Sequence, residues 1–596
     1  MQRIQRGIEF LSRLPMALAG GACLAASLAL MLLKIELPVY ANPAWGAVAV
    51  CGLPLLYWAI WSLVNGKGMR KISVALLISI AMAACIWLSF RPDGHENLFA
   101  AGEVAFIMAI GGILEEKTAK RARKGLKNLI SLQPAQGRRL ADGREEMIPA
   151  AQIGRGDVLR VLPGEAIPVD GEIIAGSTSI DQSIMTGESL PVDKGPGETV
   201  FCGTMNRFGS IDIAATKVGE DSSLQKLIRM VKEAENNKAP MQRIVDKWAA
   251  WLVPAALLIA VVTYLATRDI TRAVTVLVVF CPCALALATP TSIMAAIGQA
   301  TKHGVIIKSG GALEGMGKVD CVAFDKTGTL THGKLHVSAV EGDVLQLAAS
   351  LERYSEHPIA KAIVAHYDGE FLEVREFQAT PGVGVKGMAG GRQVEISRGV
   401  EVTVDGVYAG KITVEDQPKE SGAQTVRRLQ GMGVRVAMLT GDNRETAEKI
   451  AAQAGIENGN VYAELLPAQK VETIRALQEQ GRTVCMIGDG VNDAPALKTA
   501  SVGVAMGGMG SDIAVEAADI ALMGDDISKI PYLKRLSNAT VRLIKFNITL
   551  SMCINFLAIT LSVLGVLSPI TGALVHNAGS VLVVLNAALL YDRKYQ

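Results

Sequence analysis

The chain has 596 residues, of which half are hydrophobic and only 19% are charged, and its mean hydropathy is +0.31. A soluble protein of this length is not so apolar, so we expect membrane-spanning segments. The net charge of +2 argues against a nucleic-acid partner. The nine scattered Cys argue against a disulfide framework and for cytosolic soluble parts.

Eight apolar segments have about the 20-residue length that a bilayer requires. They lie at 15–34, 43–64, 73–91, 98–117, 248–267, 273–296, 541–565 and 570–591. Arg3, Arg6 and Arg13 precede the first segment, which is too long for a signal peptide. No Cys-x-x-Cys and no His-rich tract precedes it, so we expect no separate metal-binding domain there.

Two long polar connections, 118–247 and 297–540, carry the features of soluble domains. The first is rich in Val, Ile and Gly and predicts a small β-rich domain. The second alternates strand-like and helix-like stretches, which predicts a doubly wound α/β domain with an insert at 337–411. Basic residues flank the spans on the side of these connections, at Lys67, Arg70, Lys71, Lys117, Lys120, Arg121, Arg123 and Lys124. By the positive-inside rule, both large loops and both termini are expected in the cytosol.

The second connection contains Asp325-Lys326-Thr327-Gly328-Thr329-Leu330-Thr331 directly after the apolar run 321–324. The run predicts a buried parallel strand, and the carboxyl end of such a strand is where open α/β sheets bind ligands. Asp325 can attack a phosphoryl group, while Gly328 lets the backbone approach a phosphate. The alternative, an Asp that merely caps a turn, leaves the other six residues unexplained.

Two more apolar runs end in similar chemistry, at 437–443 and 486–497. Strand ends of one parallel sheet meet at one edge, so the three runs predict a single site. Asp489 and Asp493 supply hard oxygen ligands suited to Mg²⁺, and Lys470 can offset phosphate charge.

These motifs resemble the phosphorylation domain of P-type ATPases, which has a haloacid-dehalogenase-like fold. The resemblance implies that ATP phosphorylates Asp325 and that Asp489 and the Thr327 carbonyl help to bind Mg²⁺. It also implies that Thr440, Gly441 and Lys470 contact the phosphate.

The first connection contains Thr186-Gly187-Glu188-Ser189, which on its own reads as a surface loop. Beside the phosphorylation motif it resembles the actuator loop of the same family. Glu188 is then expected to orient or deprotonate the water that hydrolyses the aspartyl-phosphate.

The insert contains Ser355-Glu356-His357-Pro358 and, further on, Gly382-Val383-Gly384. These residues resemble the nucleotide-binding domain of the heavy-metal subgroup. The resemblance implies an adenine site at Glu356, His357, Gly382 and Gly384.

The sixth apolar segment contains Cys281-Pro282-Cys283. Pro removes a backbone hydrogen bond at membrane depth, and the two thiols are soft ligands beside the break. The alternative is a structural kink between two buried apolar Cys. The motif resembles the type IB heavy-metal ATPases rather than the sodium, calcium, proton or potassium pumps, and the plan of eight spans agrees.

The transported ion is harder to predict, because the last two spans depart from both known patterns. His576 stands where copper-type relatives have Met and zinc-type relatives have Asp, and Ile554-Asn555 replaces the Tyr-Asn or Lys of those types. A Cys281, Cys283 and His576 set suits a borderline divalent ion best. Glu103 in the fourth span resembles an acid on the zinc-type metal path, and the alternative is a helix-end Glu that faces the outer interface. Hydrogen bonding of His576 to Asn547 or Asn555 is the alternative for that residue. Whether Asn547, Asn555 or Asn577 contacts the ion is left open.

The sequence thus predicts an ATP-driven exporter of Zn²⁺, with Cd²⁺ as a mimic, that needs ATP and Mg²⁺. The expected domains are spans one to four (1–117), an actuator domain (118–247), spans five and six (248–304), a phosphorylation domain (305–336 and 412–540), an α+β nucleotide-binding domain (337–411) and spans seven and eight (541–596). The expected partners are the lipid bilayer of the cell membrane and a cytosolic metal donor, either a thiol or a chaperone. The alternatives are the same pump moving Cu⁺ or Mn²⁺, a membrane-tethered phosphatase of the dehalogenase type, and a metal-sensing receptor built on an inactive pump.

Overall fold

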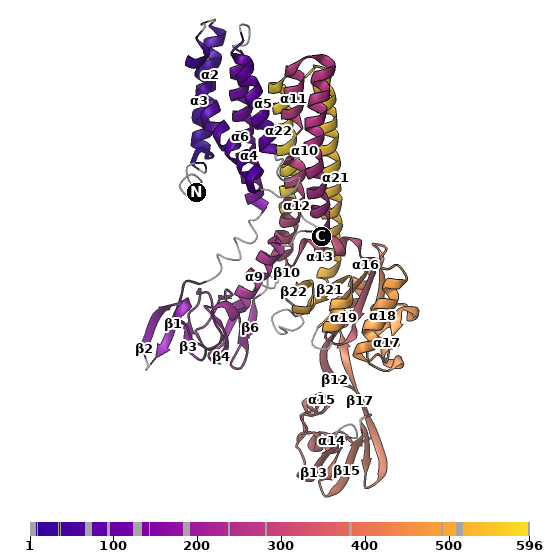
Figure 1. Ribbon diagram of the computed structural model, residues 1–596. Helices are drawn as coiled ribbons and strands as arrows, with labels where there is room; N and C mark the ends of the chain where they lie inside the picture. Colours follow the sequence, from indigo (N-terminus) through magenta and orange to yellow (C-terminus); the bar gives the residue numbers. More distant parts are fainter. Residues whose placement is uncertain are drawn as a thin grey trace. The chain divides into compact units, whose positions relative to one another are not determined.

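The structure is a computed structural model that divides into two compact units, Val319–Pro531 and the remainder of the chain. It describes all residues except 1–7, 9, 34, 36, 66–73, 92–95, 123–133, 142–143, 183–190, 237–238, 281–282, 381–383, 398, 490–492, 508–515 and 594–596. The elements are labelled in Figure 1.

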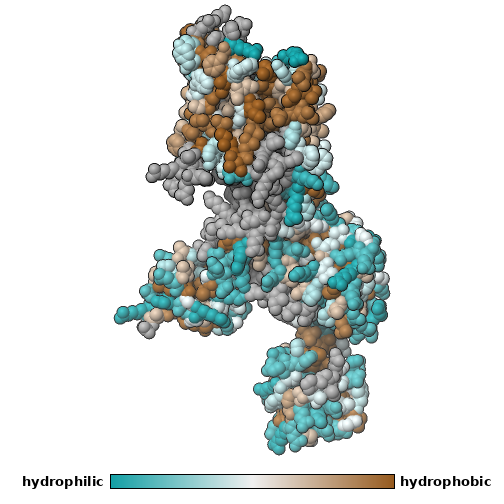
Figure 2. Space-filling view, viewed as in Figure 1, coloured by the Kyte–Doolittle hydropathy of each residue, from teal (hydrophilic) through white to brown (hydrophobic). Residues whose placement is uncertain are grey.

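Each of the eight predicted apolar segments contains helix. The helices are α2 (Leu14–Leu32), α3 (Ala44–Ala47) continuing through η2 (Val48–Gly52) into α4 (Leu53–Asn65), α5 (Val74–Ser89), α6 (Glu96–Ala122), α10 (Pro240–Thr267), α11 (Ile270–Val279), α12 (Cys283–Lys302), α21 (Lys529–Val563) and α22 (Pro569–Ala588). Within the described residues, four helical stretches are long and apolar enough to cross a membrane by length and composition, and four shorter apolar helices accompany them. Figure 2 shows apolar residues gathered over these helices and hydrophilic residues over the soluble domains.

Several of these helices extend beyond the predicted spans. Helix α10 begins at Pro240 rather than near residue 248, and α21 begins at Lys529 rather than near 541. Their first turns are polar, so an apolar window did not detect them, although the backbone hydrogen bonding of a helix continues regardless of polarity. The sixth segment is not one helix, because α11 ends at Val279 and α12 begins at Cys283. Phe280 at the break has a non-helical ψ of 56°.

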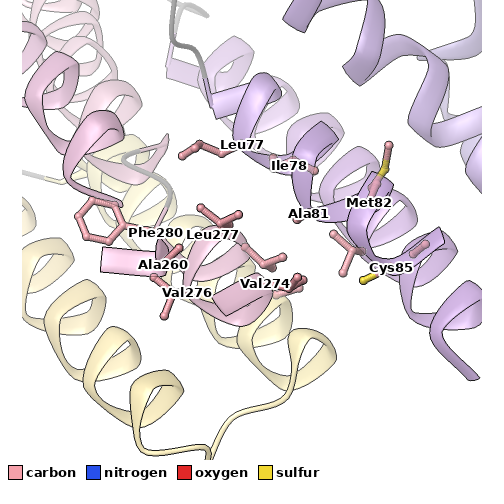
Figure 3. Packing of buried hydrophobic residues seen from close by; sticks show 14 of the residues in the cluster. Leu77, Ile78, Ala81, Met82, Cys85, Ala260, Val274, Val276, Leu277 and Phe280 are labelled. Carbon is pink, nitrogen blue, oxygen red and sulfur yellow. The ribbon is translucent and has the colours of Figure 1, made fainter. Parts of the chain in front are cut away.

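The helices pack through a cluster of buried apolar side chains. Figure 3 shows one part of it, in which α5 faces α10 and α11 through Leu77, Ile78, Ala81, Met82, Cys85, Ala260, Val274, Val276, Leu277 and Phe280. Two helix starts are fixed by capping. Asp269 accepts a hydrogen bond from the Thr271 N–H (2.8 Å), and Ser568 accepts one from the Thr571 N–H (3.2 Å).

The segment 134–236 is β-rich, as the sequence predicts. Its main sheet has the order β2-β1-β3-β9-β4-β7, and a smaller sheet has the order β6-β5-β8. The elements are β1 (Gln136–Ala141), β2 (Arg144–Pro149), β3 (Val158–Val161), β4 (Asp170–Ala175), β5 (Thr178–Asp181), β6 (Val192–Lys194), β7 (Thr199–Val200), β8 (Met205–Asn206), β9 (Ile211–Lys217) and the helix α9 (Ser223–Asn236). Alternate residues of β3 and β9, such as Leu159 and Ile213, are buried in its core, as a sheet with one covered face requires.

The unit Val319–Pro531 contains a parallel sheet with the order β22-β21-β20-β11-β18-β19. Its strands are β11 (Cys321–Asp325), β18 (Arg435–Leu439), β19 (Val461–Tyr462), β20 (Val484–Gly488), β21 (Val502–Ala505) and β22 (Ile520–Leu522). Helices α16 (Ser421–Gln430), α17 (Arg444–Ala454), α18 (Pro467–Glu479) and α19 (Ala494–Thr499) connect them. Strand β11 lies between β18 and β20, because its fully buried apolar run can pair on both sides.

The insert leaves and rejoins this sheet through two long antiparallel strands, β12 (Thr331–Glu341) and β17 (Val407–Pro418). Its own sheet has the order β12-β17-β16-β15-β14-β13. The other elements are α14 (Leu345–Glu352), α15 (Pro358–His366), β13 (Val374–Thr380), β14 (Gly384–Ala389), β15 (Arg392–Ser397) and β16 (Glu401–Val404).

Candidate functional site

The three motif-bearing strands end at one edge of the parallel sheet, as predicted. Asp325 is the last residue of β11 and pairs with Leu439 at the end of β18, while Phe324 pairs with Ile487 of β20. Asp325 is only 6% exposed. The turn Lys326–Leu330 that follows has Gly328 at φ +69°, and a Cβ there would lie 3.1 Å from Asp489 Oδ2. A glycine at this position therefore lets the third strand end approach the first.

Lys470 joins two of the predicted acids. Its ammonium lies 2.5 Å from Asp325 Oδ1 and 2.8 Å from Asp493 Oδ1. Lys470 is in the first turn of α18, and Asp493 immediately precedes α19. All three side chains are buried, so their charges interact with little screening by water.

Burial and crowding of acids change the protonation of this cluster. Loss of hydration, and then the negative charge of Asp493, raise the pKa of Asp325 to about 7, although Lys470 partly opposes the shift. Loss of hydration alone would lower the pKa of Lys470, but Asp325 and Asp493 outweigh it and the pKa of Lys470 is raised. Lys470 is therefore cationic, while Asp325 in the free protein exchanges its proton near neutral pH.

Thr440 and Gly441 follow β18 at the same edge of the sheet. Thr440 is buried, and its hydroxyl oxygen accepts a hydrogen bond from the Asp442 N–H (3.1 Å). Asp442 forms an ion pair with Lys326, the residue after Asp325. This ion pair holds the second strand end against the first.

The residues predicted to bind nucleotide lie in the insert, at the start of α15 and of β14. His357 caps α15, where its Nδ1 accepts a hydrogen bond from the Ile359 N–H (3.3 Å). Glu356 is exposed and pairs with Lys361 at 2.8 Å, and Lys361 lowers the pKa of Glu356. Gly384 has φ +148°, and a Cβ there would lie 1.9 Å from the Ile396 carbonyl oxygen. Gly382 is outside the described residues.

The predicted actuator loop connects β5 to β6, which pair as an antiparallel hairpin with Ile180 opposite Val192. Thr186, Gly187, Glu188 and Ser189 themselves lie outside the described residues. The role predicted for Glu188 therefore stays a prediction.

The predicted metal ligands belong to α12 and α22. Cys281 and Pro282 are outside the described residues, and Cys283 is described only as the first backbone position of α12. His576 of α22 is only 4% exposed, and its Nε2 has no hydrogen-bond partner among the described residues. It lines a cavity of about 10 Å³ together with Ser551, Ile554, Asn555, Gly579 and Ser580.

The hydrogen bonds suggested for His576 are not formed. Asn547 instead accepts a hydrogen bond from Asn586 Nδ2 (2.8 Å), and Asn555 lines the cavity without a hydrogen bond to His576. An imidazole nitrogen buried without a partner is unfavourable, so the cavity suits a group that supplies the missing contact.

Glu103 and Asn577 lie on two helices that pack together, α6 and α22. Glu103 is half-buried, and its Oε2 is another buried atom without a partner in the described part of the chain. Asn577 donates a hydrogen bond to the Ala573 carbonyl oxygen (3.1 Å) and packs on Gly111, where a Cβ would lie 2.0 Å from its Oδ1. Asn577 thus has a packing contact across the helix pair.

Two family models match the chain, and both correspond to the soluble domains. A P-type ATPase actuator domain matches residues 131–232, and a haloacid dehalogenase-like hydrolase matches residues 319–501. A copper-exporting P-type ATPase of Bacillus subtilis (strain 168) is 38% identical over 596 residues, with 91% of this chain and 74% of the relative covered. The chain belongs to the heavy-metal P-type ATPases.

The names of other similar proteins specify different metals. A copper-exporting P-type ATPase of Staphylococcus saprophyticus is 37% identical, with 99% of this chain and 81% of the relative covered. The crystal structure of a zinc-transporting PIB-type ATPase in the E2.Pi state has a TM-score of 0.61 and 28% identity, and covers 96% of this chain and 99% of that one. This heavy-metal P-type ATPase is therefore an ATP-hydrolysing transport enzyme, and the metal that it carries is a separate question.

The acids at the sheet edge fit Mg²⁺ in chemistry. Mg²⁺ prefers carboxylate oxygen and is usually held by one or two carboxylates together with substrate phosphates. Asp325, Asp489 and Asp493 offer such oxygens, although among the described residues no group of three or more His, Cys, Asp or Glu is arranged to hold a metal ion by itself. An open set of carboxylates that needs the phosphate to complete it is what phosphoryl transfer requires.

Sequence reasoning missed one cation of this P-type ATPase, Lys419. It directly follows β17, is 8% exposed, and donates hydrogen bonds to the carbonyl oxygens of Gly328 (3.1 Å) and Asp525 (2.9 Å). Nearby, the Thr331 hydroxyl donates to Asp416 (2.5 Å). The only sequence signal was an Asp and a Lys close to Pro418, where the insert returns. Their role becomes clear only once the end of β17 is known to pair with Thr331, at the end of the turn that follows Asp325.

Proposed function

We propose that this heavy-metal ATPase exports a divalent ion, with Zn²⁺ first and Cd²⁺ as a mimic, from the cytosol across the cell membrane. The observation that carries the proposal is the unpartnered Nε2 of His576 in a cavity lined by Ser551, Asn555 and Ser580. Imidazole nitrogen with oxygen donors suits Zn²⁺, whereas Cu⁺ prefers thiolate and thioether sulfur. The thiols of Cys281 and Cys283 complete the proposed ligand set.

The proposed reaction begins with Asp325 as the nucleophile. A carboxylate oxygen of Asp325 attacks the γ-phosphorus of ATP, the bond from phosphorus to the bridging oxygen breaks, and ADP leaves. Lys470 is placed by its two ion pairs to receive the phosphoryl oxygens as Asp325 becomes phosphorylated. Mg²⁺, when bound by Asp325, Asp489, Asp493 and the Thr327 carbonyl, would neutralise phosphate charge.

Thr440 and Gly441 lie at the edge where the phosphoryl group arrives, so they are proposed to contact it. The nucleotide base is proposed to bind in the insert, at Glu356, His357, Gly382 and Gly384. Glu188 is proposed to orient or deprotonate the water that attacks the aspartyl-phosphate, which restores the Asp325 carboxylate and releases inorganic phosphate.

The proposed orientation places both large loops and both termini in the cytosol, where ATP is available. Basic residues beside the spans support this orientation. A cytosolic thiol or chaperone is the proposed metal donor. The matched actuator domain argues against a simple phosphatase, since the phosphatase reaction does not require an actuator domain.

Cu⁺ is the second candidate, because the relatives described above at 37–38% identity are named copper-exporting ATPases. The deciding experiment measures ATPase activity of the purified chain in lipid against Zn²⁺, Cd²⁺, Mn²⁺ and Cu⁺ at controlled thiol concentration. The variants are His576→Ala and His576→Met, the second of which supplies the thioether of the copper type.

The proposal expects Zn²⁺ stimulation of the unaltered chain and its loss in His576→Ala, with phosphorylation from inorganic phosphate preserved as the control for folding. His576→Met should respond more to Cu⁺ than the unaltered chain does. Activation of the unaltered chain by Cu⁺ alone, or full Zn²⁺ stimulation of His576→Ala, would overturn the divalent assignment.

A further inference from the structure

An apolar groove lies between the first turns of α10 and the middle of α21. It has a volume of about 310 Å³ and is lined by Met241, Ile244, Val245, Trp248, Ile548 and Met552. Its lining exposes almost no polar surface, and Ile244 and Trp248 are 56% and 62% exposed. The groove is therefore an apolar cavity that is partly open to its surroundings.

Two cations precede the groove-lining residues of α21 along the helix. On α21, the exposed Lys545 is one helical turn before Ile548, on the same stripe as Ile548 and Met552. The exposed Arg542 is one turn further toward the start of the helix. Neither cation forms an ion pair with another residue that the structure describes, so both are available to an external anion.

The direction of the two helices shows which side of the membrane the charged end of the groove faces. Helix α10 begins at Pro240, shortly after the matched actuator domain, and α21 begins at Lys529, shortly after the matched hydrolase domain. Lys545 precedes the groove-lining residues of α21, so the charged end of the groove is on the side from which α21 enters the helix bundle, which is the cytosolic side in the proposed orientation. Trp248 has the amphipathic ring that favours the level of lipid headgroups.

We propose that the groove binds one anionic phospholipid of the adjoining leaflet. An acyl chain fills the trough along Val245, Ile548 and Met552, and the headgroup phosphate contacts Lys545, with Arg542 next along the helix. The apolar lining and the cations at its end match the two halves of such a lipid. A basic cluster without the groove would attract the membrane surface in general, whereas the two together select a single bound molecule.

The test uses the full chain purified in detergent, exchanged into mixed micelles that contain equal amounts of phosphatidylglycerol and phosphatidylcholine with the same acyl chains. Retained lipid is counted by mass spectrometry of the intact complex. The unaltered chain should retain about one phosphatidylglycerol in preference to phosphatidylcholine, since one groove holds one lipid.

Lys545→Gln should reduce phosphatidylglycerol affinity roughly fivefold, because a basic residue near the headgroup contributes about that factor. Arg243→Gln is the matched control, since Arg243 is exposed at a similar level of α10 but points away from the groove by helical spacing. Ile548→Trp, which fills the groove, should abolish retention, whereas Leu557→Trp on the exposed outer part of α21 should not.

Equal loss in Lys545→Gln and Arg243→Gln, or equal retention of both lipids by the unaltered chain, would overturn the proposal. Lys545→Gln is a surface change, so it remains informative if Ile548→Trp fails to fold. Because the measurement needs neither metal nor ATP, its failure would leave the transport proposal untouched.

Discussion

Lys419 donates a hydrogen bond to the carbonyl oxygen of Gly328, and its own N–H donates to the carbonyl oxygen of Leu330 at 2.9 Å. The residue that closes the insert therefore holds the middle and the last residue of the turn Lys326–Leu330 that follows Asp325. This contact links two parts of the chain that are 91 residues apart. It gives Lys419 a positioning role that requires no contact with substrate.

Replacement of Lys419 by Met should slow phosphorylation of Asp325 by ATP and lower the free energy of unfolding by about 1–3 kcal/mol, because buried carbonyl groups lose their donors. The measurements are labelling from γ-labelled ATP and thermal unfolding. Lys449→Met is the control, since Lys449 is half exposed and its ion pair with Glu415 should contribute less than about 1 kcal/mol. Unchanged labelling in Lys419→Met would show that the turn keeps its geometry without this contact.

Replacement of Asp325 by Asn should abolish labelling by ATP, because an amide cannot form the acyl-phosphate. Glu188→Gln should still label but hold the phosphate longer, because only the hydrolytic water loses its base. Labelling followed by a chase with unlabelled ATP separates the two effects. Normal turnover by either variant would contradict the assigned roles.

Binding of Mg²⁺ should depend on pH around neutrality. The pKa of Asp325 is raised to about 7 by burial and by Asp493, so a proton competes with the metal below that pH. Because the folded state favours the protonated acid, its contribution to stability is present at low pH and is lost as the pH rises through 7. The unfolding temperature without Mg²⁺ should therefore fall between pH 6 and pH 8.

Added Mg²⁺ should raise the unfolding temperature more at pH 8 than at pH 6, because a larger share of Asp325 is protonated at pH 6 and cannot bind the metal. Asp325→Asn should flatten this dependence. An equal Mg²⁺ effect at both pH values in the unaltered chain would place the metal away from Asp325.

The contact between α6 and α22 should tolerate no side chain at Gly111. A Cβ at Gly111 would lie 2.0 Å from Asn577 Oδ1, while nothing lies within 4 Å of a Cβ at the neighbouring Gly112. Gly111→Ala should destabilise the helix pair and reduce metal-stimulated ATPase activity, since small residues allow membrane helices to approach closely. Gly112→Ala is the matched control. The packing argument fails if both variants have the same unfolding temperature in detergent.

The sequence predicted the strand ends well, because an apolar run that ends in Asp325 or Asp489 combines a structural and a chemical signal. The sequence also predicted a break in the sixth apolar segment, because Pro282 cannot donate a backbone hydrogen bond within a helix. The role of Lys419 was not predictable, because its partner Gly328 is distant in sequence and the bond depends on where β17 ends. The cavity at His576 was equally hidden, since periodicity places a residue on a helix face without saying what the neighbouring helix leaves empty.

The insert begins and ends at neighbouring positions, because Glu341 of β12 pairs with Lys411 of β17. The segment between these two residues could therefore be exchanged for a short hairpin turn without stretching the chain, since a short turn closes an antiparallel pair at little entropic cost. The parallel sheet would keep its β11–β18 register, which does not involve the insert. The proposed nucleotide-binding insert is thus an exchangeable module. Its ligand preference can change during evolution while the acid cluster around Asp325 keeps its geometry.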